Sequence, residues 1–287
     1  MRIAQLRQGP AVLDGDVAHL LPASVGDLIG LGLERALDVG EQARRTPAVP
    51  FTEADLLLPY RPPSVRDFVT FESHVEGVRR SIDHASGVPE AWYDAPQFYF
   101  TNPHALYGPG EAIPRPLTSR ALDFEMEVAC VVGTELRSAA LEEAEAAIFG
   151  YTILNDWSAR DLQSREMQVG LGPAKGKDFA TSFGPWIVTA DELPSLALDC
   201  KAYVNDVLIG HDNLANMHFS FAEMVAHASR DSVVLAGDLL ASGTTGGGGC
   251  LAELWGRHGA QHPPPLEPGD VVRLEVEGLG TLSGSVR

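Results

Sequence analysis

Three carboxylates alternate with apolar residues in the segment from Leu122 to Gly133, at Asp123, Glu125 and Glu127. Side chains two residues apart in a β-strand point to the same face, so this pattern places the three acids together. A charged strand face normally contacts water. Here, however, the strand continues into the apolar run ACVV, which is typical of a buried strand. Neighbouring buried acids repel each other unless a cation offsets them, and oxygen ligands favour Mg²⁺, Mn²⁺ or Ca²⁺ over zinc.

A second polar group lies in the segment NDWSARDLQ, directly after the apolar run GYTIL. If a helix starts after Asp156, then Asp156, Arg160 and Gln163 are spaced i, i+4 and i+7 and lie on one face. Two interpretations of Asp156 stay open at this point. It is either a helix cap paired with Arg160 or a metal ligand at the end of a strand.

An aspartate and a histidine occur together in the segment RDFVTFESH, at Asp67 and His74. Their spacing of seven would place them two turns apart on one face of a helix. A single histidine is more often an ordinary surface or core residue than a catalyst. This pair alone therefore does not define a site.

Taken together, these segments resemble the fumarylacetoacetate hydrolase family. The resemblance covers roughly residues 67–253 and rests on ordered motifs: D-F-x5-H, L-D-x-E-x-E, N-D-W-S-A-R-D-x-Q, L-G-P-x2-G-K, and L-A-S-G-T followed by E-L-W. It implies a divalent metal held by carboxylates, with Mg²⁺ as the first choice and Mn²⁺ or Ca²⁺ as alternatives. The ligands implied are Asp67, Glu125, Glu127 and Asp156.

The resemblance also implies catalytic and substrate-binding residues. His74 would be the general base, and Glu253 would be the acid that orients it. A partner carboxylate of this kind would raise the pKa of the histidine above its usual value of about 6.5. The groups implied to bind substrate oxygens and stabilise oxyanions are Arg160, Gln163 and Lys177. Further substrate contacts are implied for Tyr99 and Thr244.

The activity implied is hydrolysis of a C–C bond in an acylpyruvate-like or β-diketo acid, through a chelated enolate. The alternative keeps the fold and the site but decarboxylates, hydrates or isomerises a 2-oxo acid. Gly77 favours hydrolysis, because the decarboxylase-like branch of the family has a glutamate three residues after its histidine. Val69 replaces a tyrosine of the eukaryotic hydrolase, so the substrate itself is not specified. A binding protein without activity is disfavoured, since every site position carries a competent residue.

The elements that must position these residues are mainly strands. Runs of β-branched residues, bounded by Gly, Pro, Asn or Asp, recur from residue 64 without a βαβ rhythm, which predicts an α+β, mainly β fold. The resemblance implies a mixed β-sandwich roll with a small N-terminal domain. We place that domain at residues 1–60 and the catalytic domain at residues 61–287, divided by the proline-interrupted stretch 58–63. Helices are predicted after Ser24 and Ser220, and over residues 138–150 with Gly150 as the end.

Composition limits the partners. The chain of 287 residues has 39 acidic and 21 basic residues and a net charge of −18, so neither nucleic acid nor an anionic membrane is an expected partner. No nucleotide-binding glycine motif, signal-peptide pattern or long apolar run is present, and we expect a cytoplasmic protein. Cys130, Cys200 and Cys250 are far apart and are expected to be reduced core residues. The resemblance implies a small diketo or 2-oxo acid substrate and a homodimer.

Overall fold

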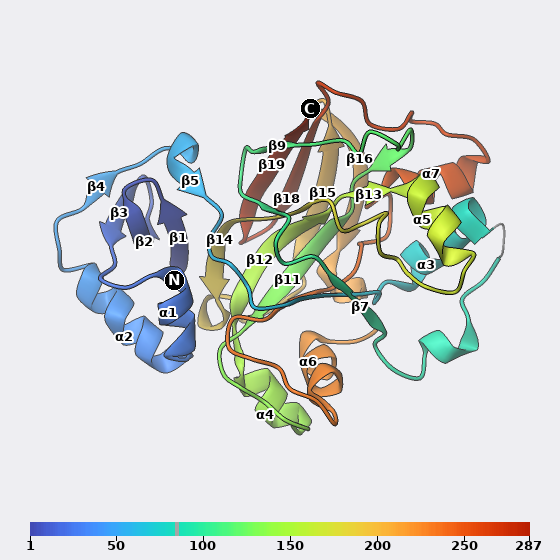
Figure 1. Ribbon diagram of the computed structural model, residues 1–287. Helices are drawn as coiled ribbons and strands as arrows, with labels where there is room; N and C mark the ends of the chain where they lie inside the picture. The colour runs from blue at the N-terminus through green and yellow to red at the C-terminus, as the bar shows by residue number, and fades with distance from the viewer. Residues whose placement is uncertain (84–85) are drawn as a thin grey trace.

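The computed structural model describes residues 1–83 and 86–287, and strands dominate it (Figure 1). The predicted α+β, mainly β class is confirmed. A 12-stranded sheet and a 5-stranded sheet pack against each other, and short helices lie around them. A helix that is both long and apolar enough to cross a bilayer does not occur among the described residues.

The large sheet runs in one continuous order. From edge to edge its strands are β4 (Val49–Pro50), β3 (Val17–Leu20), β2 (Gly9–Asp14), β1 (Arg2–Leu6), β14 (Thr181–Thr189), β12 (Ile148–Asp156), β11 (Met126–Val132), β17 (Leu239–Ala241), β6 (Val65–Phe68) and β7 (Phe98–Thr101). Two short strands extend it, β5 (Leu56–Leu57) beside β1 and β8 (Leu106–Tyr107) beside β14.

The other elements cover or flank this sheet. The small sheet runs β16 (Val207–Asn213), β15 (Asp199–Val204), β18 (Val271–Val276), β19 (Gly280–Val286) and β9 (Ala112–Ile113), and β10 (Leu122–Asp123) pairs with β13 (Ser158–Ala159). The α-helices are α1 (Val25–Gly30), α2 (Leu33–Ala43), α3 (Glu72–Val78), α4 (Leu141–Ala146), α5 (Arg160–Met167), α6 (Phe221–Ser229) and α7 (Leu251–His258).

Strand β11 is buried on both faces, which explains its nearly continuous apolar sequence. Met126, Val128 and Cys130 pack in the core between the two sheets. Ala129 and Val131 face the opposite way and pack in a second core that also contains Ile3 and other N-terminal residues. Polar side chains on this strand therefore cannot reach bulk water.

The N-terminal strands extend the large sheet. Arg2 and Ile3 of β1 pair with Val188 and Ile187 of β14, so hydrogen bonding continues from one part of the chain into the other. Figure 1 shows this part, in blue, at one side of the molecule with α1 and α2 beside it. The division at residues 60 and 61 stays a prediction.

The predicted helix caps are present, but one predicted helix end is wrong. Ser24 caps α1, and Ser220 caps α6 through a capping box with Glu223. The helix expected to end at Gly150 instead ends at Ala146, and Gly150 lies in β12. A Cβ atom at Gly150 would lie 2.3 Å from the carbonyl oxygen of Val188, so this glycine allows β12 and β14 to approach closely.

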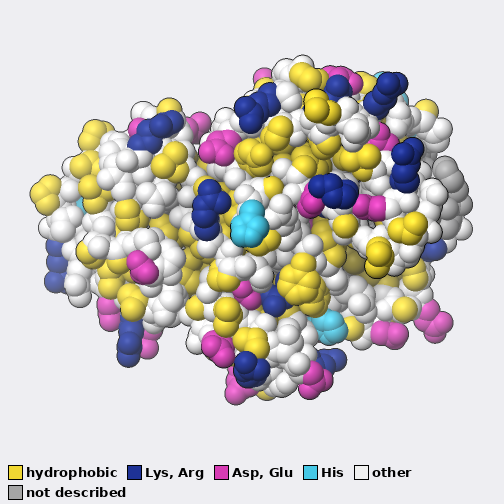
Figure 2. Space-filling model, viewed as in Figure 1, with side chains coloured by type: hydrophobic (Ala, Val, Ile, Leu, Met, Phe, Trp, Pro, Cys, Tyr) yellow, Lys and Arg dark blue, Asp and Glu magenta, His cyan; other side chains and the backbone are white. Residues whose placement is uncertain are grey.

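The positions of the cysteines and of the surface charges agree with what the composition predicts. The three cysteines are buried and free, as predicted. On the face shown in Figure 2, Lys and Arg side chains are scattered among Asp and Glu side chains and do not form one continuous basic surface.

The Gly150→Ala substitution tests the close strand packing. We expect it to lower the free energy of unfolding by about 1–3 kcal/mol, because the added methyl group meets backbone rather than a movable side chain. Gly30→Ala at the end of α1 is the control, since nothing lies within 4 Å of its Cβ position. Urea unfolding of both variants measures the difference, and equal stabilities would contradict this account.

Candidate active site

Three buried carboxylates converge at one point. Asp67, Glu125 and Glu127 each offer an oxygen, and these oxygens all lie within 4.8 Å of one another. Asp67 comes from β6 and Glu127 from β11, and these strands are separated in the sheet only by β17. Glu125 lies in the short link between β10 and β11. The expected single strand is therefore interrupted, and Asp123 does not join the cluster.

This carboxylate triad has the properties of a divalent-metal site. Burial, together with the neighbouring acids, raises the pKa values of Asp67 and Glu127 well above their usual range. The Oδ1 atom of Asp156, beside the triad, is buried and has no hydrogen-bond partner. Unneutralised acids and an unpaired oxygen in a buried place are what a hard cation with oxygen ligands would satisfy.

Two buried cations hold Glu125 in its charged form. Lys177 forms ion pairs with Glu125 and, at 2.6 Å, with Asp156, and an Arg160 nitrogen lies 2.7 Å from Glu125 Oε1. Burial alone would raise the pKa of Glu125, but Lys177 and Arg160 hold it below its usual range. Glu125 thus belongs to the triad and also pairs with both buried cations, Lys177 and Arg160.

The helical interpretation of Asp156 is wrong. Asp156 ends strand β12, and α5 begins only at Arg160, so the two residues do not share a helix face. Asp156 pairs with Lys177 instead. The hydroxyl of Tyr99 donates to Asp67 at 2.9 Å and to Asp156 at 2.5 Å, which places Asp156 next to the triad. Arg160 and Gln163 do meet on α5, where the guanidinium donates to the amide oxygen at 3.0 Å.

His74 lies on helix α3, whereas Asp67 lies on strand β6, so the expected single helix through both residues is wrong. Burial lowers the pKa of His74 to about 4; Arg160 and Lys177 act in the same direction, and Glu125 opposes them. The upward shift expected from a partner carboxylate is therefore not found. The imidazole is neutral at pH 7, which is the form a general base requires.

Glu253 is completely buried on α7, close to the helix that carries His74. It forms an ion pair with Arg257 and accepts the Gly248 N–H at 3.2 Å. Burial raises the pKa of Glu253 to about 7, although Arg257 opposes this. Among the described residues no hydrogen bond joins His74 to Glu253, and the His74 Nδ1 atom instead faces the Cys250 sulfur at 3.9 Å. The dyad stays a prediction.

The glycine-rich loop that starts at Gly243 packs against the carboxylate of Glu127. The Gly243 N–H donates to Glu127 at 3.2 Å, and the Thr244 hydroxyl donates to the same carboxylate at 3.4 Å. Gly243 has φ +79°, and a Cβ atom there would lie 2.4 Å from the Phe68 carbonyl oxygen. Only glycine allows the loop to pass this close to β6.

Nine of the eleven residues predicted for the site line one cavity of about 250 Å³. They are Asp67, His74, Tyr99, Glu125, Glu127, Arg160, Gln163, Lys177 and Thr244. The other two predicted residues, Asp156 and Glu253, are buried and do not line the cavity. Sequence reasoning missed the rest of the lining, of which Val75, Val78 and Arg79 follow His74 closely enough to have been suspected. Val69, Met167 and Pro173 also lie on the wall.

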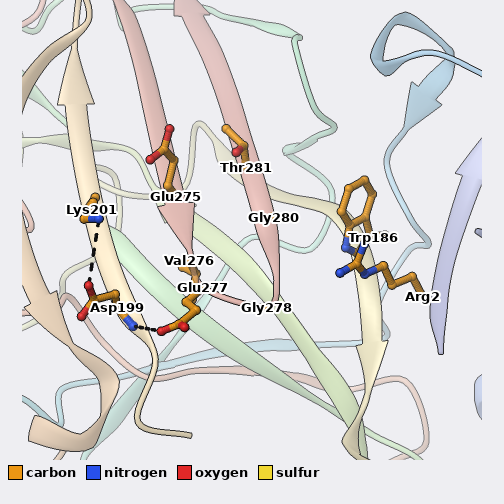
Figure 3. A pocket seen from close by; sticks show the side chains of 10 residues that line it. All are labelled: Arg2, Trp186, Asp199, Lys201, Glu275, Val276, Glu277, Gly278, Gly280 and Thr281. Carbon is orange, nitrogen blue, oxygen red and sulfur yellow. Dashed lines mark hydrogen bonds and ion pairs between the residues drawn. The ribbon is translucent and has the colours of Figure 1, made fainter. Parts of the chain in front are cut away.

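A larger groove lies elsewhere, between β1, β14 and the small sheet, and its volume is about 520 Å³ (Figure 3). Arg2 lies over the ring of Trp186 at 5.7 Å, and Lys201 is 4.0 Å from Asp199. Of the charged residues that line this groove, Lys201 thus lies beside an acid, and Arg2 contacts an aromatic ring. It contains none of the predicted residues, and no buried acids converge in it.

Comparison with known proteins supports these assignments at the level of family and fold. The family model described as fumarylacetoacetate (FAA) hydrolase C-terminal matches residues 64–287. A fumarylacetoacetate hydrolase from Exiguobacterium antarcticum is 26% identical with a TM-score of 0.80, covering 100% of this chain and 99% of that one.

Two further solved structures show that different activities share this fold. A probable 2-hydroxyhepta-2,4-diene-1,7-dioate isomerase from Mycobacterium abscessus is 27% identical with a TM-score of 0.78, covering 100% of this chain and 97% of that one. A maleylpyruvate hydrolase from Sphingobium sp. SYK-6, in complex with manganese (II) ion and pyruvate, is 25% identical with a TM-score of 0.73. That match covers 100% of this chain and 98% of the hydrolase.

Glu127→Gln is the cleanest test of the metal site, because no ion pair joins Glu127 to a cation within the part of the chain that the structure describes. We expect Mn²⁺ affinity to fall at least about tenfold. The metal-free variant should be about as stable as the wild type, since burial and the neighbouring acids already favour the neutral form of Glu127 when no metal is bound.

Isothermal calorimetry with Mn²⁺ measures the affinity, and thermal unfolding in chelator measures the stability. Glu142→Gln, on the exposed side of α4, is the matched control and should change neither quantity. Wild-type Mn²⁺ affinity in Glu127→Gln would exclude Glu127 as a ligand.

Proposed function

The chain belongs to the fumarylacetoacetate hydrolase family, and we propose that it is a metal-dependent hydrolase that cleaves a C–C bond in an acylpyruvate-like or β-diketo acid. The observation that carries this proposal is the cavity in which a buried acidic triad lies beside two buried cations and a neutral histidine. These groups match the parts that such a reaction needs: a metal, a base and oxyanion donors. The homodimer and the cytoplasmic location stay predictions.

The metal would be a divalent cation, with Mg²⁺ as the first choice. Asp67, Glu125 and Glu127 would hold it together with Asp156, whose Oδ1 atom is unpaired and buried. Bound there, it would supply Lewis-acid stabilisation of negative charge on the substrate oxygens. The manganese complex of the related maleylpyruvate hydrolase supports a divalent ion in this family.

His74 supplies the proton chemistry in this proposal. The neutral imidazole takes a proton from water, and the hydroxide oxygen bonds to the distal carbonyl carbon of the substrate. The C–C bond between that carbon and the neighbouring CH₂ then breaks, and its electron pair passes to the enolate of the leaving 2-oxo acid. The imidazolium returns its proton to the CH₂ carbon. One water is consumed, and two acids, or an acid and a ketone, are released.

Arg160 and Lys177 bind the substrate oxygens on which negative charge develops. Both cations are held in place before substrate arrives, Lys177 by Asp156 and Glu125, and Arg160 by Glu125. Charges that are already oriented in a site closed to water stabilise an oxyanion without reorganising during the reaction. Gln163 is held against Arg160 and adds a further polar contact.

The packing of Glu253 supports hydrolysis over decarboxylation. A Cβ atom at Gly77 would lie 2.4 Å from Cγ of Glu253. A glutamate at position 77, as in the decarboxylase-like branch, could not coexist with Glu253 in its present place. Isomerisation is the second candidate, because a structural neighbour carries that activity in its name.

A panel of substrates tests the proposed reaction. We expect cleavage of acylpyruvates or β-diketo acids in the presence of Mg²⁺ or Mn²⁺, seen as loss of enol absorbance, with two acids or an acid and a ketone among the products. Chelator should abolish the reaction, and re-addition of metal should restore it. Release of CO₂, addition of water or isomerisation without cleavage would each overturn hydrolysis, and isomerisation would establish the second candidate.

The base is tested by His74→Ala. We expect kcat to fall roughly 10²–10⁴-fold while Mn²⁺ affinity is unchanged, because His74 transfers a proton and is outside the triad. The base must be neutral to act, and its pKa is about 4. The wild-type kcat/KM should therefore rise with pH through about 4 and be level, as far as His74 is concerned, above about pH 6.

Glu253→Gln tests whether Glu253 acts with His74. If the two residues act as a unit, the single variants lose comparable activity and the double variant loses little more. Near-native turnover in His74→Ala would exclude it as the base. Additive losses would show that Glu253 acts separately, as the absence of a direct hydrogen bond allows.

A further inference from the structure

One completely buried carboxylate outside the cavity contacts two parts of the site. Asp123 has no exposed surface and does not line the cavity. Its Oδ2 atom accepts the Arg160 Nε–H at 2.8 Å and the Ala252 N–H at 3.0 Å. Its Oδ1 atom accepts the N–H groups of Leu251 and Phe124, both at 2.8 Å. Each oxygen of Asp123 therefore accepts two hydrogen bonds.

The contact with Arg160 fixes the guanidinium plane. A second Arg160 nitrogen also lies 2.8 Å from Asp123 Oδ2, so the carboxylate holds one edge of the group. The same nitrogen, Nη2, also lies 2.7 Å from Glu125 Oε1, and Nη1 donates to the Gln163 amide oxygen at 3.0 Å. Because the guanidinium is planar, holding one edge determines where its remaining N–H groups point.

The contact with α7 fixes the start of that helix. The first N–H groups of a helix have no partner within it, and a negative charge beside them is favourable. Asp123 accepts from Leu251 and Ala252, the first two residues of α7, and Glu253 follows directly. The position of Glu253 therefore depends on the same carboxylate as that of Arg160.

We propose that Asp123 is a positioning residue, whose single carboxylate holds Arg160 and the first turn of α7 at a fixed separation beside the cavity. The inference rests on the proposed function, in which Arg160 binds a substrate oxygen. A displacement of about 1 Å at such a group can cost about 10²-fold in rate. Asp123 would thus affect catalysis without touching the substrate.

A purely structural role is the alternative, and the chain offers a matched comparison. Arg66 and Asp238 form another buried ion pair, at 2.8 Å, with side-chain exposures of 7% and 3%. Neither residue lines the cavity. Asp238→Asn should therefore lower stability without changing the activity of the folded protein, as any merely structural loss would.

The experiment compares Asp123→Asn, Asp238→Asn, Arg160→Gln and the double variant Asp123→Asn/Arg160→Gln. We expect Asp123→Asn to lower kcat/KM about 10–100-fold, whereas Asp238→Asn stays within about twofold of wild type at a similar loss of thermal stability. Arg160→Gln should lower kcat/KM about 10²–10³-fold. Adding Asp123→Asn to it should cost less than about threefold more, because Arg160 is the group next to the substrate through which most of the effect of Asp123 passes, and the contact with α7 adds only the remainder.

The Arg160 Nε–H signal in ¹H–¹⁵N spectra provides a readout that needs no turnover. We expect a slowly exchanging signal in the wild type and in Asp238→Asn, and its loss in Asp123→Asn. If the wild type cleaves no diketo acid, the proposed function fails, while this signal still tests the positioning. Should Asp123→Asn not fold, Asp123→Glu replaces it, since it keeps the charge but moves it by one methylene and should likewise lower kcat/KM.

Three results would overturn the inference. The first is a kcat/KM for Asp123→Asn as close to wild type as that of Asp238→Asn. The second is an additive loss in the double variant, which would mean that Asp123 does not act through Arg160. The third is an unchanged Arg160 signal in Asp123→Asn.

Discussion

Negative charge buried around Glu125 is the constraint on which the rest of the site depends. Glu125 meets two other triad acids on one side and two cations on the other, all shielded from water. A buried charge without partners is far less stable than the same charge in water, so each group here requires the others. Lys177 and Arg160 hold Glu125 in its ionised form, and in the proposed function the same two cations bind the substrate oxygens.

The fold supplies this arrangement through strands that are buried on both faces. Glu127 projects from β11, and the loop that starts at Gly243 closes over it and donates a hydrogen bond. Asp67 projects from β6, one strand further along the sheet after β17. The sheet thus fixes the distance between these acids, while the helices α3, α5 and α7 bring His74, Arg160 with Gln163, and Glu253 to the same end (Figure 1).

Much of the site could be predicted from the sequence, because its residues occur in short ordered motifs. The spacing of Glu125 and Glu127 correctly indicated two acids close together, although only Glu127 lies on strand β11 and Asp123, expected on the same face, does not join them. The helical spacings failed for Asp67 with His74 and for Asp156 with Arg160, because a strand end interrupts each segment. Local periodicity does not reveal where a strand gives way to a helix when both lie within ten residues.

Other features depend on pairing between distant segments. Gly150 was mistaken for a helix end because its close contact is with Val188 on another strand. The pKa of His74 was expected to rise, yet burial and two cations from α5 and the following loop lower it. The role of Asp123 was likewise invisible, since its partners Arg160 and Leu251 are 37 and 128 residues away.

The charge balance explains why protons and a metal are alternatives in this site. Asp67, Glu125, Glu127 and Asp156 bring four carboxylates together, and Asp123 adds a fifth at Arg160, whereas Lys177 and Arg160 offset only two of the five when all are ionised. Without a cation the remaining charge is relieved by protonation, which is why the pKa values of Asp67 and Glu127 are raised. In the proposed function a divalent ion would neutralise two of the remaining charges and displace those protons, so metal binding would weaken as the pH falls. Little net charge would then remain, and an anionic substrate could approach Lys177 and Arg160 without meeting a large excess of negative charge.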